Sequence, residues 1–255
     1  MIKQFFLALQ FLTRIPVPAK LTGQIKESDV ASSVMFFPLI GLIIGGILVV
    51  VNLGLTFIFP SISTILTLFV YLFLTGALHL DGFVDTVDGL YGGKGKKEEI
   101  LRIMDDSRIG AIGAVWLGAL LILKVVLFFG IGLEVSFSLA IILMCVLSRF
   151  GMVLQMFISP AAKTGLASMF CKKISKIEFA VAFIFTLITA VLVSVKAPVL
   201  GVKAGAAFFV VIVSGTLIAA YFKKKLSGIN GDVIGFSAEI AEIIVLLLLI
   251  ANFKF

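Results

Sequence analysis

The sequence predicts an all-α fold: a polytopic transmembrane helical bundle of about seven spans, preceded by an N-terminal interfacial helix. Two observations predict it. The 255 residues are 61% apolar and 14% charged, whereas soluble domains are near half apolar and a quarter charged. Seven apolar stretches also approach the roughly 20 residues that cross a bilayer. We expect a single integral membrane domain over residues 1–255, with spans at 34–59, 61–80, 109–130, 135–158, 179–195, 199–222 and 233–253.

The N-terminal segment combines Lys3 with an apolar run from Phe5 to Leu12. A signal peptide has a similar pattern, but no small-x-small cleavage site follows here, and Pro16 and Pro18 interrupt the segment. We therefore expect an uncleaved helix that lies on the membrane surface.

Lysine and arginine are distributed unequally between the predicted loops. With the N-terminus in the cytoplasm, 16 of the 21 basic residues fall in cytoplasmic segments, three fall outside, and Lys124 and Arg149 lie within spans. Such an excess marks the cytoplasmic side of a membrane protein. All acidic residues except Glu134 also fall in or beside cytoplasmic segments. We expect a multi-pass protein of the cell membrane whose functional site faces the cytoplasm.

The net charge of +7 does not indicate nucleic-acid binding, because the basic residues are scattered through short loops and form no stripe with interleaved aromatic residues. The lipid bilayer is the expected surrounding instead. Cys145 and Cys171 have neither metal-ligand spacing nor a disulfide pattern, and we interpret them as packing residues.

Three carboxylates follow one another at positions i, i+4 and i+7 in His79-Leu-Asp81-Gly-Phe-Val-Asp85-Thr-Val-Asp88-Gly89. On a helix they lie within an arc of roughly 60°, where like charges repel by several tenths of a kcal/mol per pair. A bound cation would reverse the sign of this interaction. Carboxylate oxygens without cysteine favour Mg²⁺, with Mn²⁺ as the alternative. The competing interpretation is a helix end whose acidic residues are solvated.

A second group of candidates, Asp105-Asp106-Ser107-Arg108-Ile-Gly110, precedes the third predicted span. A carboxylate here can ligate a metal or accept a proton from an alcohol. Arg108 and the amides of a helix N-terminus can hold phosphate oxygens. Aspartate and serine before a helix are equally typical of N-caps.

Charged residues in and beside other segments are candidates for substrate binding, namely Arg14, Arg149, Asp232, Glu239 and Glu242. Each has a structural alternative. Arg14 could extend from an interfacial helix into water, and Arg149 could neutralise a buried acid. The acidic residues at the start of the last span could cap that helix or interact with its dipole.

Taken together, these motifs resemble those of the cobalamin synthase family, the adenosylcobinamide-GDP ribazoletransferases. The resemblance extends from one terminus to the other. It rests on Leu12-Thr13-Arg14-Ile15-Pro16-Val17-Pro18, Phe37-Pro38-Leu39-Ile40-Gly41, the segment from His79 to Gly89, Met104 with Asp106-Ser107-Arg108-Ile-Gly110, Ser148-Arg149, and Gly231-Asp232 with Gly235, Glu239 and Glu242.

The resemblance implies an integral membrane enzyme, a single catalytic domain that requires Mg²⁺. The hydroxyl of α-ribazole, or of its 5′-phosphate, would attack the phosphate attached to cobinamide in adenosylcobinamide-GDP, and GMP would leave. Arg108 and Arg149 would bind the pyrophosphate.

By the same resemblance, and by analogy with CDP-alcohol phosphotransferases, Asp81, Asp85 and Asp88 would be metal ligands. Asp106 would be a further ligand or the general base. The spacing Asp-x3-Asp-x2-Asp-Gly differs from the alcohol phosphotransferase pattern, so the catalytic role is left open between Asp88 and Asp106.

An ion-coupled membrane transporter is the alternative from another functional class. Transporters place ionisable residues near the bilayer midplane, often in repeated halves, whereas here the acidic residues gather at one face and no internal repeat is evident. A scaffold without catalysis would leave the three-carboxylate stripe unexplained. A homo-oligomer is compatible with the sequence.

Overall fold

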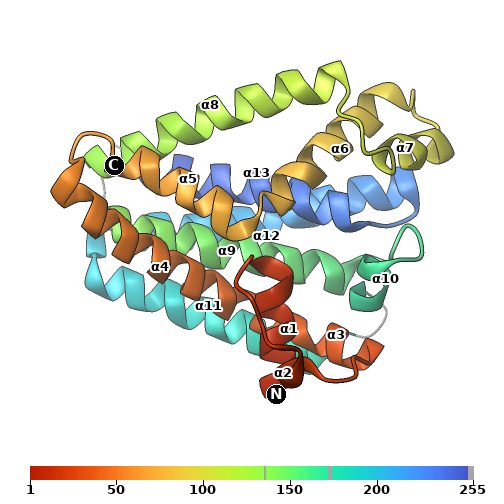
Figure 1. Cartoon of the computed structure of the whole chain (residues 1–255), viewed down its shortest axis with the longest axis horizontal. Coiled ribbons are helices and arrows are strands. Elements are labelled where there is room, and N and C mark those ends of the chain that lie inside the picture. Colours follow the sequence, from red (N-terminus) through yellow and green to blue (C-terminus); the bar gives the residue numbers. More distant parts are fainter. Residues whose placement is uncertain (135, 172–173, 252–255) are drawn as a thin grey trace.

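The computed structural model describes residues 1–134, 136–171 and 174–251, and this part of the chain is helical, with no β-strand (Figure 1). The helices in chain order are α1 (Ile2–Leu12), α2 (Ala19–Thr22), α3 (Glu27–Ser33), the 3₁₀ turn η1 (Val34–Phe36), α4 (Phe37–Ile58), α5 (Ser63–Thr75), α6 (Leu78–Gly92), α7 (Lys97–Met104), α8 (Ala111–Glu134), α9 (Phe137–Ile158), α10 (Leu166–Cys171), α11 (Lys176–Lys196), α12 (Pro198–Leu226) and α13 (Gly231–Ile250).

Within the described residues, six helices are long and apolar enough to cross a membrane, and a bent pair, α5 with α6, can make a seventh span. The six contain α4, α8, α9, α11, α12 and α13. They lie side by side as an elongated bundle with their loops at its two ends (Figure 1). The prediction of an all-α polytopic bundle of about seven spans is confirmed.

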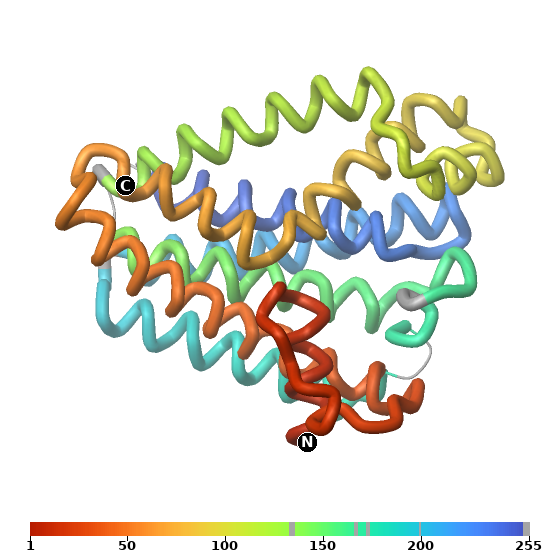
Figure 2. The backbone as a smooth tube through the Cα atoms, in the orientation of Figure 1, coloured from red at the N-terminus to blue at the C-terminus, as the bar shows by residue number. Residues whose placement is uncertain are grey.

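The predicted span 61–80 is not one continuous helix. Helix α5 ends and α6 begins on either side of Gly76 and Ala77, and the two helices are bent by 83°. Both intervening residues have left-handed backbones, with φ of 63° and 55°. Glycine adopts this conformation readily, whereas alanine incurs a cost of roughly 1–2 kcal/mol. The bend, visible in Figure 2, places the three-carboxylate segment on a helix of its own.

Helix α9 forms the centre of the bundle and is the most completely buried of the candidate spans. Helix α4 approaches it through Gly41 and Gly45. A Cβ atom on Gly41 would overlap the carbonyl oxygen of Cys145, and one on Gly45 would lie 3.0 Å from the Cα of Ile142. Small residues four positions apart allow membrane helices to come this close.

The predicted N-terminal helix is present as α1, and it packs against the bundle. Lys3 forms an ion pair with Asp29 of α3 at 2.5 Å. At the other end of α1, the Phe11 ring lies 5.8 Å from that of Phe37 in α4 and 5.1 Å from that of Phe170 in α10. Its position at a membrane surface stays a prediction.

Two connections at one end of the bundle are tied together by backbone hydrogen bonds. The amide of Ala162 donates to the Ile229 carbonyl at 2.8 Å, and the amide of Ile229 donates to the Pro160 carbonyl at 2.9 Å. A Cβ atom on Gly228 would overlap the same carbonyl of Pro160. These contacts hold the α9–α10 and α12–α13 connections beside the start of α13, where the candidate site lies.

Candidate active site

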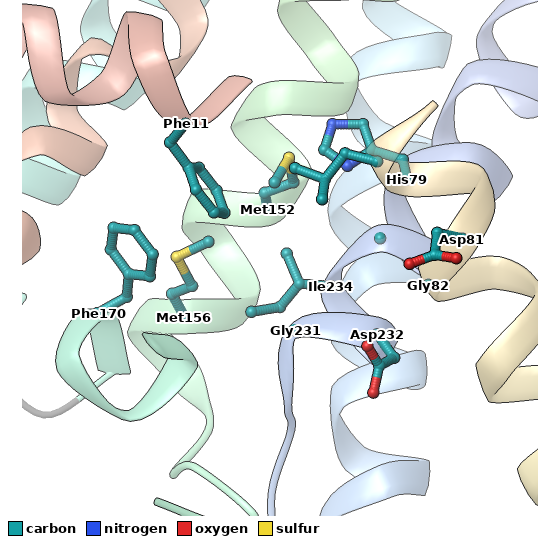
Figure 3. Close-up of a pocket in the computed structure, with 12 residues that line it drawn as sticks. Phe11, His79, Asp81, Gly82, Met152, Met156, Phe170, Gly231, Asp232 and Ile234 are labelled. Atoms are coloured by element: carbon teal, nitrogen blue, oxygen red, sulfur yellow. The ribbon is translucent and has the colours of Figure 1, made fainter. Parts of the chain in front are cut away.

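The site begins where α6 and α13 pack almost backbone to backbone. A Cβ atom on Gly82 would lie 2.9 Å from the Cα of Asp232, and one on Gly235 would lie 3.2 Å from the carbonyl oxygen of His79. Because neither glycine has a side chain, the two helices come close enough for Asp81 and Asp232 to line the same two cavities. Figure 3 shows the smaller one. Residues about 150 positions apart in the sequence are thereby brought together.

We call the larger of these spaces the acidic cavity. It has a volume of about 400 Å³ and lies between α6, the α7–α8 connection, the α9–α10 connection and the start of α13. Five carboxylates and one lysine line it, together with polar residues that include Ser107, Thr164 and Asn230. The charged residues are Asp81, Asp85, Asp105, Asp106, Asp232 and Lys163.

Two of the five carboxylates are neutralised by basic side chains. Asp105 forms an ion pair with Lys163. Asp106 pairs with Arg108 at 2.6 Å, and this guanidinium lowers the pKa of Asp106 to about 2. The Arg108 side chain is itself 84% exposed, so a ligand in solution can reach it.

The other three carboxylates form no ion pair in the part of the chain that the structure describes. The Asp232 carboxylate accepts a hydrogen bond from the side-chain amide of Asn230 at 2.7 Å. The side chains of Asp81 and Asp85 form neither a hydrogen bond nor an ion pair there, and Asp85 is half-buried and experiences the negative charges of Asp81, Asp232 and Asp88. The cavity therefore has an excess of negative charge.

Asp88, the third carboxylate of the α6 segment, has different surroundings. Its two oxygens accept hydrogen bonds from the amides of Gly110 and Gly113, each at 2.8 Å, at the start of α8. A Cβ atom on either glycine would overlap this carboxylate. Asp88 thus satisfies amides that an α-helix leaves free at its N-terminus. It also lines a neighbouring cavity with Asp106 and Arg108. Its role as a metal ligand or catalytic residue stays a prediction.

Three predicted substrate-binding residues lie elsewhere, inside the bundle. Arg149, Glu239 and Glu242 are buried with Lys124, and none of the four lines the acidic cavity. Glu242 lies 2.6 Å from Arg149 and 2.7 Å from Lys124, and Glu239 lies 2.5 Å from Lys124. The hydroxyl of Tyr71 donates to Glu242. We call the four charged residues the ionic cluster. This geometry agrees with the alternative interpretation of Arg149, in which its side chain neutralises a buried acid.

Arg14 lies at the break between α5 and α6. Its amide donates to the Leu74 carbonyl at 2.7 Å, and a Cβ atom on Gly76 would overlap its guanidinium. The side chain is exposed and does not line the acidic cavity.

Asn230 lines the acidic cavity but was not predicted as a site residue from the sequence. It caps α13 by accepting a hydrogen bond from the Val233 amide at 3.0 Å. The Asn-Gly pair before the last span was the available signal.

The residues of the acidic cavity fit a divalent cation in one particular way. Among the described residues, no three histidine, cysteine, aspartate or glutamate side chains are grouped so that they could hold a metal ion. Mg²⁺, however, is commonly held by one or two carboxylates together with waters and the phosphates of a substrate. The unpaired carboxylates of Asp81 and Asp85 suit that arrangement.

The fold and the site define a polytopic membrane protein with a carboxylate-rich cavity at one end of its bundle, next to an exposed arginine. Comparison with known proteins gives the family. The cobalamin-5-phosphate synthase family model matches residues 4–250, and the chain belongs to this family.

Individual relatives align over nearly their whole length. The chain is 36% identical over 253 residues to a protein of Geotalea daltonii, with 98% of both chains covered. It is 31% identical over 250 residues to one of Thermoanaerobacter sp., with 96% of both covered. It is 35% identical over 255 residues to one of Clostridium tetani, with 98% and 97% covered. All three relatives are named adenosylcobinamide-GDP ribazoletransferase. No solved structure matches the chain.

Proposed function

We propose that this chain is an adenosylcobinamide-GDP ribazoletransferase. It transfers the cobinamide-phosphate group of adenosylcobinamide-GDP to a hydroxyl of α-ribazole, or of α-ribazole 5′-phosphate, and GMP leaves. Family membership over residues 4–250 and full-length relatives of that name support this activity. The family and the relatives give no support to an ion-coupled transporter.

The observation that carries the proposal at the level of the site is that Asp81 and Asp85 lie in the acidic cavity with neither a hydrogen bond nor an ion pair among the described residues. We propose that Asp81 and Asp85 hold Mg²⁺, or alternatively Mn²⁺, together with pyrophosphate oxygens of the substrate. Such a cation, when bound, neutralises charge on the transferred and leaving phosphates. We also propose that Asp232, which lines the same cavity, orients the acceptor alcohol by accepting a hydrogen bond from it.

The exposed guanidinium of Arg108 can turn from Asp106 to the pyrophosphate, where it would form charge-assisted hydrogen bonds. This movement has a consequence for Asp106, because the ion pair is the main cause of its low pKa. Once Arg108 has left, Asp106 becomes a stronger base.

The alcohol can then react with Asp106 as its general base. Its oxygen forms a bond to the phosphorus that carries cobinamide, and its proton passes to Asp106. The bond from that phosphorus to the bridging oxygen breaks, and GMP leaves with the electron pair. Asp88 is the alternative base, but both its oxygens are engaged by amides of α8.

We further propose that the acidic cavity opens to the cytoplasm and that the N-terminus lies on the same side. The support is the loop charge: 16 of 21 basic residues fall on that side of the predicted topology. The water-soluble acceptor would then reach the site directly from the cytoplasm.

The test is GMP release by the purified protein with Mg²⁺, adenosylcobinamide-GDP and α-ribazole. Removing divalent cations with EDTA should abolish turnover, and adding Mg²⁺ should restore it. Asp81→Asn should lower kcat/KM by roughly 100-fold or more, as expected for loss of an electrostatic contact to the reacting phosphates. Asp85→Asn should also raise the Mg²⁺ concentration needed for half-maximal turnover.

Glu99→Gln is the matched control, because Glu99 pairs with Arg102 on α7 and does not line the acidic cavity. It should retain wild-type turnover. Absence of GMP release from folded wild-type protein, or full activity in Asp81→Asn, would overturn the proposal.

A further inference from the structure

A second cavity adjoins the acidic one and has a different chemical character. Its volume is about 170 Å³, and it lies between α1, α6, α9, α10 and α13 (Figure 3). It shares Asp81 and Asp232 with the acidic cavity, so the two spaces meet at these carboxylates. We call it the apolar cavity, and its side-chain walls include Phe11, His79, Met152, Met156, Phe170 and Ile234.

The walls are suited to a flat aromatic group. Phe11 and Phe170 lie on the side away from the two carboxylates, with Met152 and Met156 beside them (Figure 3). Aromatic rings and thioether sulfurs both pack favourably against aromatic ligands. The volume is well below the roughly 300–1,000 Å³ of pockets that enclose a whole drug-sized ligand. The apolar cavity therefore fits one ring system of a larger substrate.

Besides the carboxylates, this wall contains a buried imidazole with a nitrogen that has no partner among the described residues. His79 is 4% exposed, and its Nε2 has no hydrogen-bond partner among the described residues. The Nε2 atom is itself enclosed, while the His79 ring lines the cavity. Buried polar groups in proteins are nearly always hydrogen-bonded, so a ligand in the cavity with an acceptor atom would satisfy this imidazole after a small rotation of the ring.

The ring systems of the two substrates differ in size and polarity. The corrin ring is far larger than the cavity, and guanine has several donors and acceptors along its edges that these apolar walls would leave unpaired. The base of α-ribazole is a dimethylbenzimidazole, which is bicyclic, apolar and has a single free ring nitrogen. That nitrogen is a hydrogen-bond acceptor for an imidazole N–H.

We propose that the apolar cavity is the subsite for the benzimidazole base of α-ribazole, with His79 as the residue that recognises its ring nitrogen. The inference rests on the proposed function and adds to it the position of the acceptor substrate. With the base in the apolar cavity, the attached ribose extends past Asp81 and Asp232 into the acidic cavity. Its hydroxyls are thereby presented to the phosphates.

The test compares wild-type protein with His79→Ala and Met156→Ala. Both variants should raise the KM for α-ribazole by about tenfold, the equivalent of one hydrogen bond or a comparable packing contact. The KM for adenosylcobinamide-GDP should be unchanged. His79→Gln, which keeps an N–H donor, should recover part of the affinity. Met144→Ala is the control, because Met144 is buried in the same helix and does not line this cavity.

Free 5,6-dimethylbenzimidazole supplies a second readout. It should inhibit competitively with α-ribazole and not with adenosylcobinamide-GDP, and Met156→Ala should weaken that inhibition even if His79→Ala fails to fold. Equal changes in both KM values, or no change in either, would overturn the subsite.

Calorimetric titration of α-ribazole into wild-type protein and Met156→Ala separates the two proposals, because it needs no turnover. Binding that is weakened in the variant supports the subsite even if GMP is never released, an outcome that would overturn only the proposed function. Turnover by wild type with equal α-ribazole affinity in the variant would overturn only the subsite.

Discussion

At the scale of single residues, the ionic cluster shows how this chain keeps charges inside a membrane bundle. Lys124, Arg149, Glu239 and Glu242 give two charges of each sign, all buried. Removing one partner of a buried ion pair typically lowers the free energy of unfolding by about 3–5 kcal/mol, because the other charge is left without compensation. Glu242→Gln should therefore lower the thermal unfolding temperature strongly when the protein is heated in detergent.

The double variant Lys124→Met/Glu239→Gln is the control for charge balance. It removes one charge of each sign and leaves the pair between Arg149 and Glu242 intact. It should unfold at a higher temperature than Glu242→Gln, although it replaces more residues. If the double variant is the less stable of the two, charge balance is not what maintains the cluster.

The sequence identified Lys124 and Arg149 as charges within spans, but it could not identify their partners. Which residues face each other depends on how α8, α9 and α13 are rotated, and apolar composition leaves that rotation undetermined. The same limit applies to Asp88. Its spacing from Asp81 and Asp85 predicts a shared role, which stays a prediction. The spacing could not show that α6 packs against α8 so that the Asp88 carboxylate accepts hydrogen bonds from the amides of Gly110 and Gly113.

At the scale of the helices, the acidic cavity depends on the close contact of α6 with α13. Gly82→Ala would place a Cβ atom 2.9 Å from the backbone of Asp232, so the helices must separate. A displacement of about 1 Å can cost roughly 100-fold in rate when reacting groups must be aligned. We expect GMP release by Gly82→Ala to fall at least about tenfold, with the protein still helical by circular dichroism.

Gly118→Ala is the matched control for this substitution. Gly118 lies in the interior of α8, and a Cβ atom there would have no atom of the described residues within 4 Å, apart from its own helix backbone and chain neighbours. Alanine is favoured over glycine in a helix by roughly 0.5–1 kcal/mol, so this variant should be fully active and at least as stable as wild type. Equal activity in Gly82→Ala and Gly118→Ala would contradict the importance of the α6–α13 contact.

The helices that the sequence predicted well are those whose length and hydropathy alone define them. Helices α9, α11 and α12 match their predicted spans within a few residues. The bend between α5 and α6 was missed because the apolar run continues through it. Gly76 alone indicated only weak helix propensity at this point. The left-handed backbone of Ala77 is unfavourable for alanine, and the surrounding packing must offset that free energy.

At the scale of the whole molecule, the acidic cavity, the connections that line it and several basic segments lie at the same end of the bundle. The connections that line the acidic cavity, α7–α8, α9–α10 and α12–α13, meet at this end. The basic segment 94–97 and the basic residues 223–225 at the end of α12 lie there too (Figure 1). A single end thus combines the basic residues expected on the cytoplasmic side with the carboxylates of the proposed site.

This arrangement predicts the accessibility of two exposed lysines at opposite ends of the bundle. In a Cys145→Ala/Cys171→Ser background, Lys96→Cys places a thiol before α7, and Lys196→Cys places one at the end of α11. A membrane-impermeant maleimide should label Lys196→Cys in right-side-out vesicles and Lys96→Cys in inverted ones. Helices α9 and α11 run from the end with the acidic cavity to the opposite end, where Lys196 lies (Figure 1). The opposite labelling pattern would therefore place the proposed site on the outer face of the membrane. That result would contradict both the orientation inferred from the positive-inside distribution and the proposal that α-ribazole reaches the site from the cytoplasm.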